Sequence, residues 1–150
     1  MKTVIGLILL MFVFQISVTG QCGSKRKTAK MIYKYVNKGE GIYLKDQVYE
    51  NGIDKSYTIV LSAKTVYGIY LLNPSNKLPL LSLFNKNTGK PLKEIEQRVI
   101  NTEKDYYAFY KFETKEAGTY DLILDFGSKE KNCVVVVLAF IKRVRDKNKK

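Results

Sequence analysis

The side chains that most often do chemistry in proteins are sparse and scattered in this chain. It contains no histidine, which removes the commonest general base and the commonest metal ligand. Ser-His-Asp, Cys-His and histidine-containing zinc sites are thereby excluded within the chain. Glu94 and Glu96 come closest to a carboxylate pair, but their lysine and arginine neighbours are typical of a solvated charged surface. We therefore expect no catalytic residues, no cofactor and no bound metal.

Two cysteines are present, Cys22 and Cys133. Behind an export signal the compartment is oxidising, so they can form a disulfide that ties the N-terminal segment to a core strand. The alternative is a buried free thiol at Cys133, which would pack as a small hydrophobic side chain. A further alternative is lipidation of Cys22, since a cysteine just after a signal sequence can begin a bacterial lipoprotein, although Gln21 departs from the small residue such a motif needs.

The aromatic side chains of residues 106–112 suggest either a stacking platform for sugars or bases, or core packing. Alternation along a strand would place about half of them in the core. Tyr107 falls on the outward face, so it is the remaining candidate for stacking against a ligand.

The net charge of +12, from 26 Lys+Arg against 14 Asp+Glu, permits binding to nucleic acid, anionic lipid or acidic glycan. The basic residues are spread along the chain and few are arginine, which favours a solubilising surface and argues against nucleic acid. Two basic ends remain as candidate polyanion contacts. Their residues are Lys25, Arg26, Lys27, Lys142, Arg143, Arg145 and Lys147.

The first 20 residues have the pattern of a signal peptide. Lys2 precedes an apolar run, Val4–Phe14, that is shorter than the about 20 residues needed to span a bilayer. Val18 and Gly20 are small enough for the two pocket positions of a signal peptidase, which predicts cleavage after Gly20. An uncleaved signal anchor is the alternative.

Three further segments follow the predicted signal peptide. Residues 21–30 are predicted to be a flexible basic tether, residues 31–143 a β-sandwich domain and residues 144–150 a basic tail. Within the domain, Met31–Val36 has a strand-like pattern of apolar residues.

A period of two in hydrophobicity dominates the rest of the chain. Asp105–Phe126 reads as two strands joined by a polar corner at Thr114–Thr119. Cys133–Ile141 is apolar on both faces, which predicts a central strand. Other strands are expected at Ile42–Tyr49, Ser56–Ala63, Val66–Leu72 and Leu80–Phe84, with a turn at Asn85–Lys90, while Pro91–Thr102 could be a strand or a helical turn. About eight strands predict an all-β, antiparallel, jelly-roll-like sandwich.

The residues YYAFYKFETKEAGTYDLILDF followed by CVVVVLAFIKR are similar to the closing strands of GOLD-type and bacterial pre-peptidase C-terminal-like β-sandwiches. Upstream, SYTIVLSAKTVYGIYLL and LPLLSLFNKNTGKPL resemble the opening strands and hairpin of that group. The resemblance covers roughly Val48–Arg143 and implies a non-catalytic sandwich outside the cytoplasm. The acidic Ca²⁺-binding clusters of some relatives are missing, so metal binding is not carried over.

These observations predict a non-catalytic exported binding or structural module of the bacterial cell envelope. It would be periplasmic, outer-membrane-associated or secreted, with a protein or glycan partner, and would associate with a membrane if Cys22 is lipidated. One alternative is a binder of acidic glycan or lipid through the basic ends. Another is a small secreted hydrolase with an unrecognised site.

Overall fold

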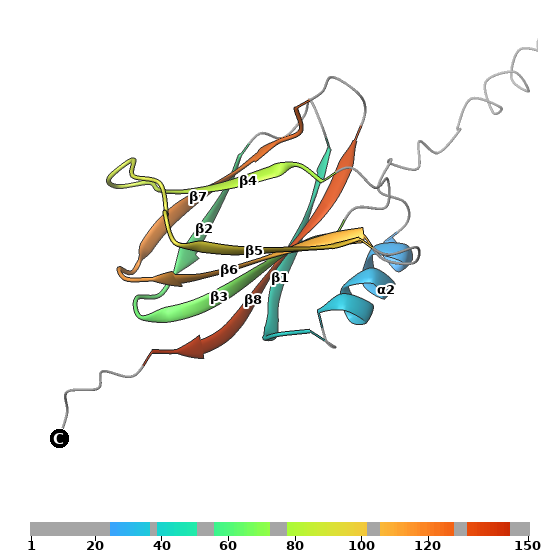
Figure 1. Cartoon of the computed structure of the whole chain (residues 1–150), viewed down its shortest axis with the longest axis horizontal. Coiled ribbons are helices and arrows are strands. Elements are labelled where there is room, and N and C mark those ends of the chain that lie inside the picture. Colours follow the sequence, from blue (N-terminus) through green and yellow to red (C-terminus); the bar gives the residue numbers. More distant parts are fainter. Residues whose placement is uncertain are drawn as a thin grey trace, which may run out of the picture.

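The computed structural model describes residues 25–36, 39–50, 56–72, 78–101, 106–127 and 132–144. The predicted signal peptide and the tail from residue 145 onwards lie outside these residues. The described chain forms one helix and eight strands (Figure 1). They are α2 (Lys25–Tyr35), β1 (Ile42–Glu50), β2 (Ser56–Leu61), β3 (Thr65–Leu72), β4 (Leu80–Asn85), β5 (Ile95–Asn101), β6 (Tyr106–Thr114), β7 (Gly118–Asp125) and β8 (Cys133–Arg143).

The strands form two antiparallel sheets, which confirms the predicted all-β sandwich. The large sheet has the order β1-β8-β3-β6-β5 and the small sheet the order β2-β7-β4. From β1 to β5 the chain changes sheet at every strand, as it does again at β7 and β8, and this alternation is characteristic of a jelly roll. The departure is at β6, which follows β5 in the same sheet and pairs with it. Just before β5, Pro91 forms an isolated antiparallel β-bridge with Phe84 of β4.

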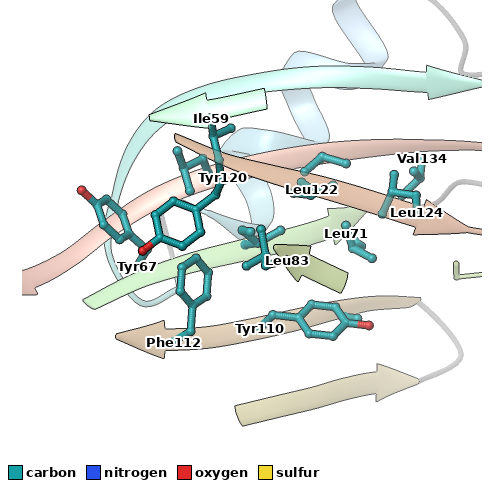
Figure 2. Close-up of a cluster of buried hydrophobic side chains, with 14 of the residues drawn as sticks. Ile59, Tyr67, Leu71, Leu83, Tyr110, Phe112, Tyr120, Leu122, Leu124 and Val134 are labelled. Atoms are coloured by element: carbon teal, nitrogen blue, oxygen red, sulfur yellow. The ribbon is translucent and has the colours of Figure 1, made fainter. Parts of the chain in front are cut away.

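Alternate side chains of the two sheets meet to form the main core (Figure 2). The small sheet contributes Ile59, Leu61, Leu83, Leu122 and Leu124, and the large sheet contributes Ile69, Leu71, Tyr110, Phe112, Val134 and Val136. The predicted alternation along Ser56–Ala63 and along both arms of Asp105–Phe126 is therefore confirmed. Pro91–Thr102, which the sequence left open, contains the edge strand β5.

The strand β8 lies between β1 and β3 in the large sheet. Val134 and Val136 face the small sheet, whereas Val135 and Val137 belong to a second cluster on the outer face. Residues 133–139 are all buried. The prediction of a central strand with two buried faces is confirmed.

The helix α2 covers the outer face of the large sheet (Figure 1). Its apolar residues Met31, Ile32 and Tyr35, together with the following Val36, pack against the outer cluster of buried side chains. That cluster contains Tyr70, Leu72, Phe109, Val135, Val137 and Ala139. The molecule therefore has three layers: helix, large sheet and small sheet.

Two predictions for the N-terminal part of the domain are wrong. Residues 25–30, expected to be a flexible tether, and Met31–Val36, expected to be a strand, form α2 and its end. Apolar residues at 31, 32, 35 and 36 share one face of a helix, whereas a strand would divide them between its two faces. Lysine, arginine, alanine and methionine are good helix formers, and the outer cluster of the sheet offers this face a place to pack.

A glycine in the middle of β3 allows this outer cluster to close. A Cβ atom built on Gly68 would lie 2.6 Å from Cε2 of Phe109, on the neighbouring strand β6. Real Cβ atoms do not approach other atoms so closely. The Phe109 ring thus occupies the space that any other residue at position 68 would fill.

The edge strand β1 carries two features that discourage pairing with another chain. Its register with β8 shifts between Tyr43 and Lys45, which marks a bulge at Leu44. Lys45 follows the bulge, and its Nζ lies 4.5 Å from the centre of the Tyr57 ring. Bulges and charged side chains, lysine especially, are common protections of sheet edges.

Candidate functional site

An open cleft of about 630 Å³ lies where the connection between β4 and β5 faces the corner between β6 and β7. Figure 1 shows both connections at the same end of the sandwich. The lining residues come from these two segments and the start of β7. They are Asn85, Thr88, Lys90, Pro91, Leu92, Lys93, Glu94, Glu113, Lys115, Glu116 and Tyr120.

The first wall of the cleft is the β4–β5 connection, which its own hydrogen bonds hold in shape. Asn85 Oδ1 accepts hydrogen bonds from the backbone N–H groups of Asn87, at 3.0 Å, and Thr88, at 3.2 Å. The N–H of Gly89 donates to the carbonyl of Asn85 at 2.7 Å, and Gly89 has a φ of 65°, which glycine adopts without strain. The predicted turn at Asn85–Lys90 is confirmed, and it fixes the base from which Lys90 projects.

The second wall is the β6–β7 corner, which is anchored on both sides. Thr114 is buried, and its Oγ1 lies 2.5 Å from the carbonyl oxygen of Ser62 and 3.0 Å from that of Thr65. On the other side, the hydroxyl of the buried Tyr120 donates to the carbonyl of Glu116 at 3.0 Å. The corner therefore presents Glu113, Lys115 and Glu116 from a fixed backbone.

Three lysines and three glutamates line the cleft, so its formal charge is balanced. Lys115 Nζ lies 3.7 Å from Glu94 Oε1, which joins the two walls, but the side chains are 75% and 83% exposed. Such a pair contributes little to stability. Within the described chain no ion pair engages Lys90 and Lys93 on one wall or Glu113 and Glu116 on the other. The cleft thus offers opposite charges on facing walls.

The two glutamates considered as a carboxylate pair do not act together. Glu94 lies in the cleft beside Lys115, whereas Glu96 Oε1 accepts from Arg98 Nε at 2.8 Å and from Arg98 Nη2 at 2.6 Å. Glu96 and Arg98 belong to β5 at the edge of the large sheet. Each carboxylate is therefore engaged by a different basic residue.

A second charged group fastens the segment after α2 to the large sheet. Lys111 Nζ donates to Glu40 Oε2 at 2.6 Å, and Arg98 Nη1 donates to Glu40 Oε1 at 3.0 Å. The hydrogen bond from Lys111 is the main reason that the pKa of Glu40 is lowered. The backbone carbonyl of Glu40 also accepts from the hydroxyl of Tyr70 at 2.8 Å, and burial raises the pKa of Tyr70 to about 12. This group supports the fold.

Tyr107, the predicted stacking residue, faces outward from the large sheet but is partly covered by α2. Its ring centroid lies 4.7 Å from that of Tyr35 and 6.4 Å from that of Tyr70. Its stacking partners in this structure are therefore aromatic rings of the same chain. The more open aromatic ring is Tyr33 on α2, which is 65% exposed.

The predicted basic ends do not come together. Lys25, Arg26 and Lys27 lie in α2, whereas Lys142 and Arg143 lie at the exposed end of β8. Figure 1 places these two regions at opposite ends of the sandwich. Arg145 and Lys147 lie outside the described residues.

Cys133 is fully buried at the start of β8 and is disulfide-bonded. The sequence contains only one other cysteine, Cys22, which lies outside the described residues. The pairing of the two, and the lipidation of Cys22, therefore stay predictions.

The cleft itself was missed by sequence reasoning. Both connections were predicted as polar turns, but only the order of the strands shows that they face one another. In the part of the chain that the structure describes, no group of three His, Cys, Asp or Glu residues could hold a metal ion. Nor is any helix of these residues long and apolar enough to cross a bilayer.

No family model, no curated protein and no solved structure matches the chain. The resemblance to GOLD-type and pre-peptidase C-terminal-like sandwiches accordingly stays a prediction.

Proposed function

We propose that this chain is a non-catalytic, exported binding module of the bacterial cell envelope, and that it binds its partner in the cleft between the β4–β5 connection and the β6–β7 corner. The observation that carries the proposal is the cleft itself. It has the size of a ligand site, and hydrogen bonds hold both of its walls in place. A preformed site of this kind avoids much of the ordering cost of binding.

The charges of the cleft favour a protein segment of mixed charge as the partner. Lys90 and Lys93 face Glu113 and Glu116 across the cleft, so an anionic ligand would meet repulsion on one side and a cationic ligand on the other. A segment with one basic and one acidic side chain can satisfy both walls. A sugar would lack an exposed aromatic ring to stack on, because Tyr120 is buried.

Binding is preferred over hydrolysis because of how the acidic groups are engaged. A glycoside hydrolase needs two carboxyl groups that flank one bond, and other hydrolases need a nucleophile within reach of a base. Here Glu94 is paired with Lys115 in the cleft, and Glu96 is paired with Arg98 on β5. Both are arranged as surface ion pairs.

Export is supported by the N-terminal sequence pattern and by chemistry at Cys133. Disulfides form and persist mainly in oxidising compartments outside the cytoplasm, and Cys133 is disulfide-bonded. If its partner is Cys22, lipidation is excluded, because one sulfur atom cannot make both bonds.

The proposal is tested by titrating ¹⁵N-labelled protein with a capped five-residue peptide that contains one lysine and one glutamate among alanines. Amide signals of residues 88–94 and 113–116 should shift, and peptides with only lysine or only glutamate should shift them less. The double variant Lys90→Ala with Glu116→Ala should lose the response. The charge-matched control, Asp46→Ala with Lys142→Ala, should keep it.

Two results would contradict the proposal. Equal responses of the two double variants would place binding elsewhere on the molecule. Cleavage of peptide, ester or glycoside substrates by pure protein would show that the module is catalytic.

A further inference from the structure

The strand β5 forms one edge of the large sheet. It ends the strand order β1-β8-β3-β6-β5, and within the described chain it pairs only with β6. Its residues include no proline, and their register with β6 is unbroken. The opposite edge strand, β1, instead has a bulge at Leu44. An unbroken edge strand presents a row of backbone N–H and C=O groups to another chain, so β5 is the edge of this sheet that is suited to accept a further strand.

Glu96 and Arg98 are the charged residues of β5, and both lie on the outer face of the sheet. Arg98 is paired in register with Phe109 of β6, which belongs to the outer cluster, and Glu96 is two residues away on the same face. Within the described chain, Glu96 Oε1 accepts both hydrogen bonds from Arg98, and Glu96 Oε2 has no partner. Arg98 uses three N–H donors, two on Glu96 and one on Glu40, and its guanidinium has others. Each side chain can therefore bond a second partner.

The order of these residues makes β5 complementary to a second copy of itself. If two β5 strands run antiparallel with Gln97 opposite Gln97, Glu96 of each copy faces Arg98 of the other across a two-fold axis. Charges of alternating sign then lie side by side, and opposite charges directly across a strand pair stabilise it. Moving the axis by one residue in either direction would set Arg98 against Arg98, or Glu96 against Glu96. The charges therefore select one register.

The inner face of β5 supports the same register. Val99 lies opposite the buried Ala108, on the side directed towards the small sheet, yet its side chain is 52% exposed. Ile95 lies on the same face and packs against the main core. In the pairing centred on Gln97, Val99 of each copy faces Ile95 of the other, and such apolar cross-strand pairs stabilise a sheet. The pairing would thus cover an apolar side chain that the small sheet leaves exposed.

We propose that β5 pairs antiparallel with β5 of a second copy of this chain, about a two-fold axis at Gln97, and joins two large sheets into one continuous sheet. Figure 1 shows the β4–β5 connection, which forms one wall of the cleft, leading into β5. Because the joined strands run antiparallel, the clefts of the two copies would lie at opposite ends of the strand pair. This inference does not depend on what the cleft binds.

The test is sedimentation velocity of the full mature protein over a wide range of concentrations. Wild type should shift from monomer to dimer as the concentration rises. Glu96→Arg and Arg98→Glu should each weaken dimerisation by at least about tenfold, since like charges then face each other beside the axis. An equal mixture of the two variants should dimerise as wild type does, because the arginines of one chain then face the glutamates of the other.

The double variant Glu96→Arg with Arg98→Glu should also dimerise, because it reverses every facing charge pair and leaves the net charge unchanged. Asp46→Arg is the charge control. It changes the net charge as Glu96→Arg does, but on β1 at the opposite edge of the sheet, and should dimerise as wild type does. Circular dichroism should show that all variants are folded, since the side chains of Arg98 and Glu96 are 51% and 53% exposed.

The register is tested separately by single cysteines under mild oxidation. Gln97→Cys puts two sulfur atoms beside the two-fold axis, where the Cα atoms of facing residues are about 5 Å apart and a disulfide can close. Asn101→Cys, also exposed on β5, is the control. Its two copies would lie about 27 Å apart, at about 3.4 Å per residue along the strands. Linked dimers should therefore form several-fold faster with Gln97→Cys.

Four outcomes would overturn the proposal. One is a wild-type protein that stays monomeric at every concentration. Another is equal weakening by Glu96→Arg and Asp46→Arg, which would show only a net-charge effect. The third is failure of both the mixture and the double variant to dimerise, and the fourth is equally fast linkage through positions 97 and 101. Either of the last two would exclude the register centred on Gln97.

Discussion

Glu40 connects three parts of the molecule through one side chain and its own carbonyl group. Its carboxylate accepts from Lys111 on β6 and Arg98 on β5, and its carbonyl accepts from Tyr70 on β3. Its pKa is lowered from 4.5, so the ionised form is the one that the folded state prefers. The stability that the ionised carboxylate contributes is fully present at pH values above the ordinary pKa of glutamate. It is lost as the pH falls through the lower pKa that Glu40 has in the folded protein.

Replacing Glu40 with Gln should therefore reduce the free energy of unfolding at neutral pH and should matter less in acid. The expected loss at pH 7 is about 1 kcal/mol or less, because the partners are partly exposed. Urea unfolding at pH 7 and pH 3 measures it. Glu116→Gln, in the cleft, is the control and should change stability little at either pH. An equal loss of stability for Glu40→Gln at both pH values would show that the charge of Glu40 does not contribute to stability.

Gly68 is a second residue whose role follows from one contact. Gly68→Val should lower the free energy of unfolding by about 1–3 kcal/mol, since the Phe109 ring must move to admit the side chain. Chemical denaturation measures the change. The control is Gly118→Ala, because a Cβ there would come no closer than 3.9 Å to Asn87. If Gly68→Val is as stable as wild type, the outer cluster is less tightly packed than the structure indicates.

At the scale of elements, α2 depends on its buried side. Val36 closes the helix and is fully buried against the outer cluster, whereas Tyr33 faces water. Val36→Asp should cost about 3 kcal/mol or more, because it buries an unpaired charge. Tyr33→Asp introduces the same charge on the opposite side and should stay within about 0.5 kcal/mol of wild type. Thermal unfolding measures the stability of both variants. A larger loss for Tyr33→Asp than for Val36→Asp would contradict the packing of α2.

Most strands could be predicted from the sequence because their two faces meet different environments. In β2 the exposed Thr58 and Val60 alternate with the buried Ile59 and Leu61, and this contrast is visible as a period of two. The region of α2 was misread because Ile32 and Val36 were assigned to one face of a strand and Tyr33 and Tyr35 to the other, although the apolar residues 31, 32, 35 and 36 have helical spacing. The edge strand β5 was ambiguous because its side chains are largely exposed, so no buried face marks it.

The cleft could not be predicted because it depends on strand order. Asn85–Glu94 and Glu113–Tyr120 are polar turns and strand ends about 25 residues apart in the sequence, as loops of many sandwiches are. They face each other because β4 and β6 lie next to β7 and β5, respectively, in opposite sheets. Hydrophobic periodicity identifies strands but says nothing about which strands pair.

For the molecule as a whole, β8 is the strand that contributes to both hydrophobic clusters, the core between the sheets and the outer cluster under α2. Val136 is 3% exposed in the core between the sheets, so Val136→Asp should prevent folding. Val99 on β5 is 52% exposed, and Val99→Asp is the matched control that should fold. Circular dichroism and thermal melting show whether each variant folds. A Val136→Asp protein that melts within a degree or so of wild type would contradict the central position of β8.

The proposed export also makes a prediction for the whole chain. Mass spectrometry of protein recovered from the envelope or medium should find an N-terminus at Gln21, in open or cyclised form, because Val18 and Gly20 fit signal peptidase. A non-reducing peptide map should join Cys22 to Cys133. An intact Met1, or a lipid on Cys22, would contradict this form of the mature protein.

The position of β8 also affects when the protein can fold. It is the last of the eight described strands along the chain, yet it lies inside the large sheet, between β3 and the edge strand β1, and in the described chain β1 pairs with no other strand. A ribosome delivers β1 first and β8 last, so a growing chain holds β1 and β3 without the strand that belongs between them. Long-range pairing of this kind forms late and slowly. Until β8 has been synthesised, the polypeptide should therefore remain loosely folded, a state that would suit the proposed export.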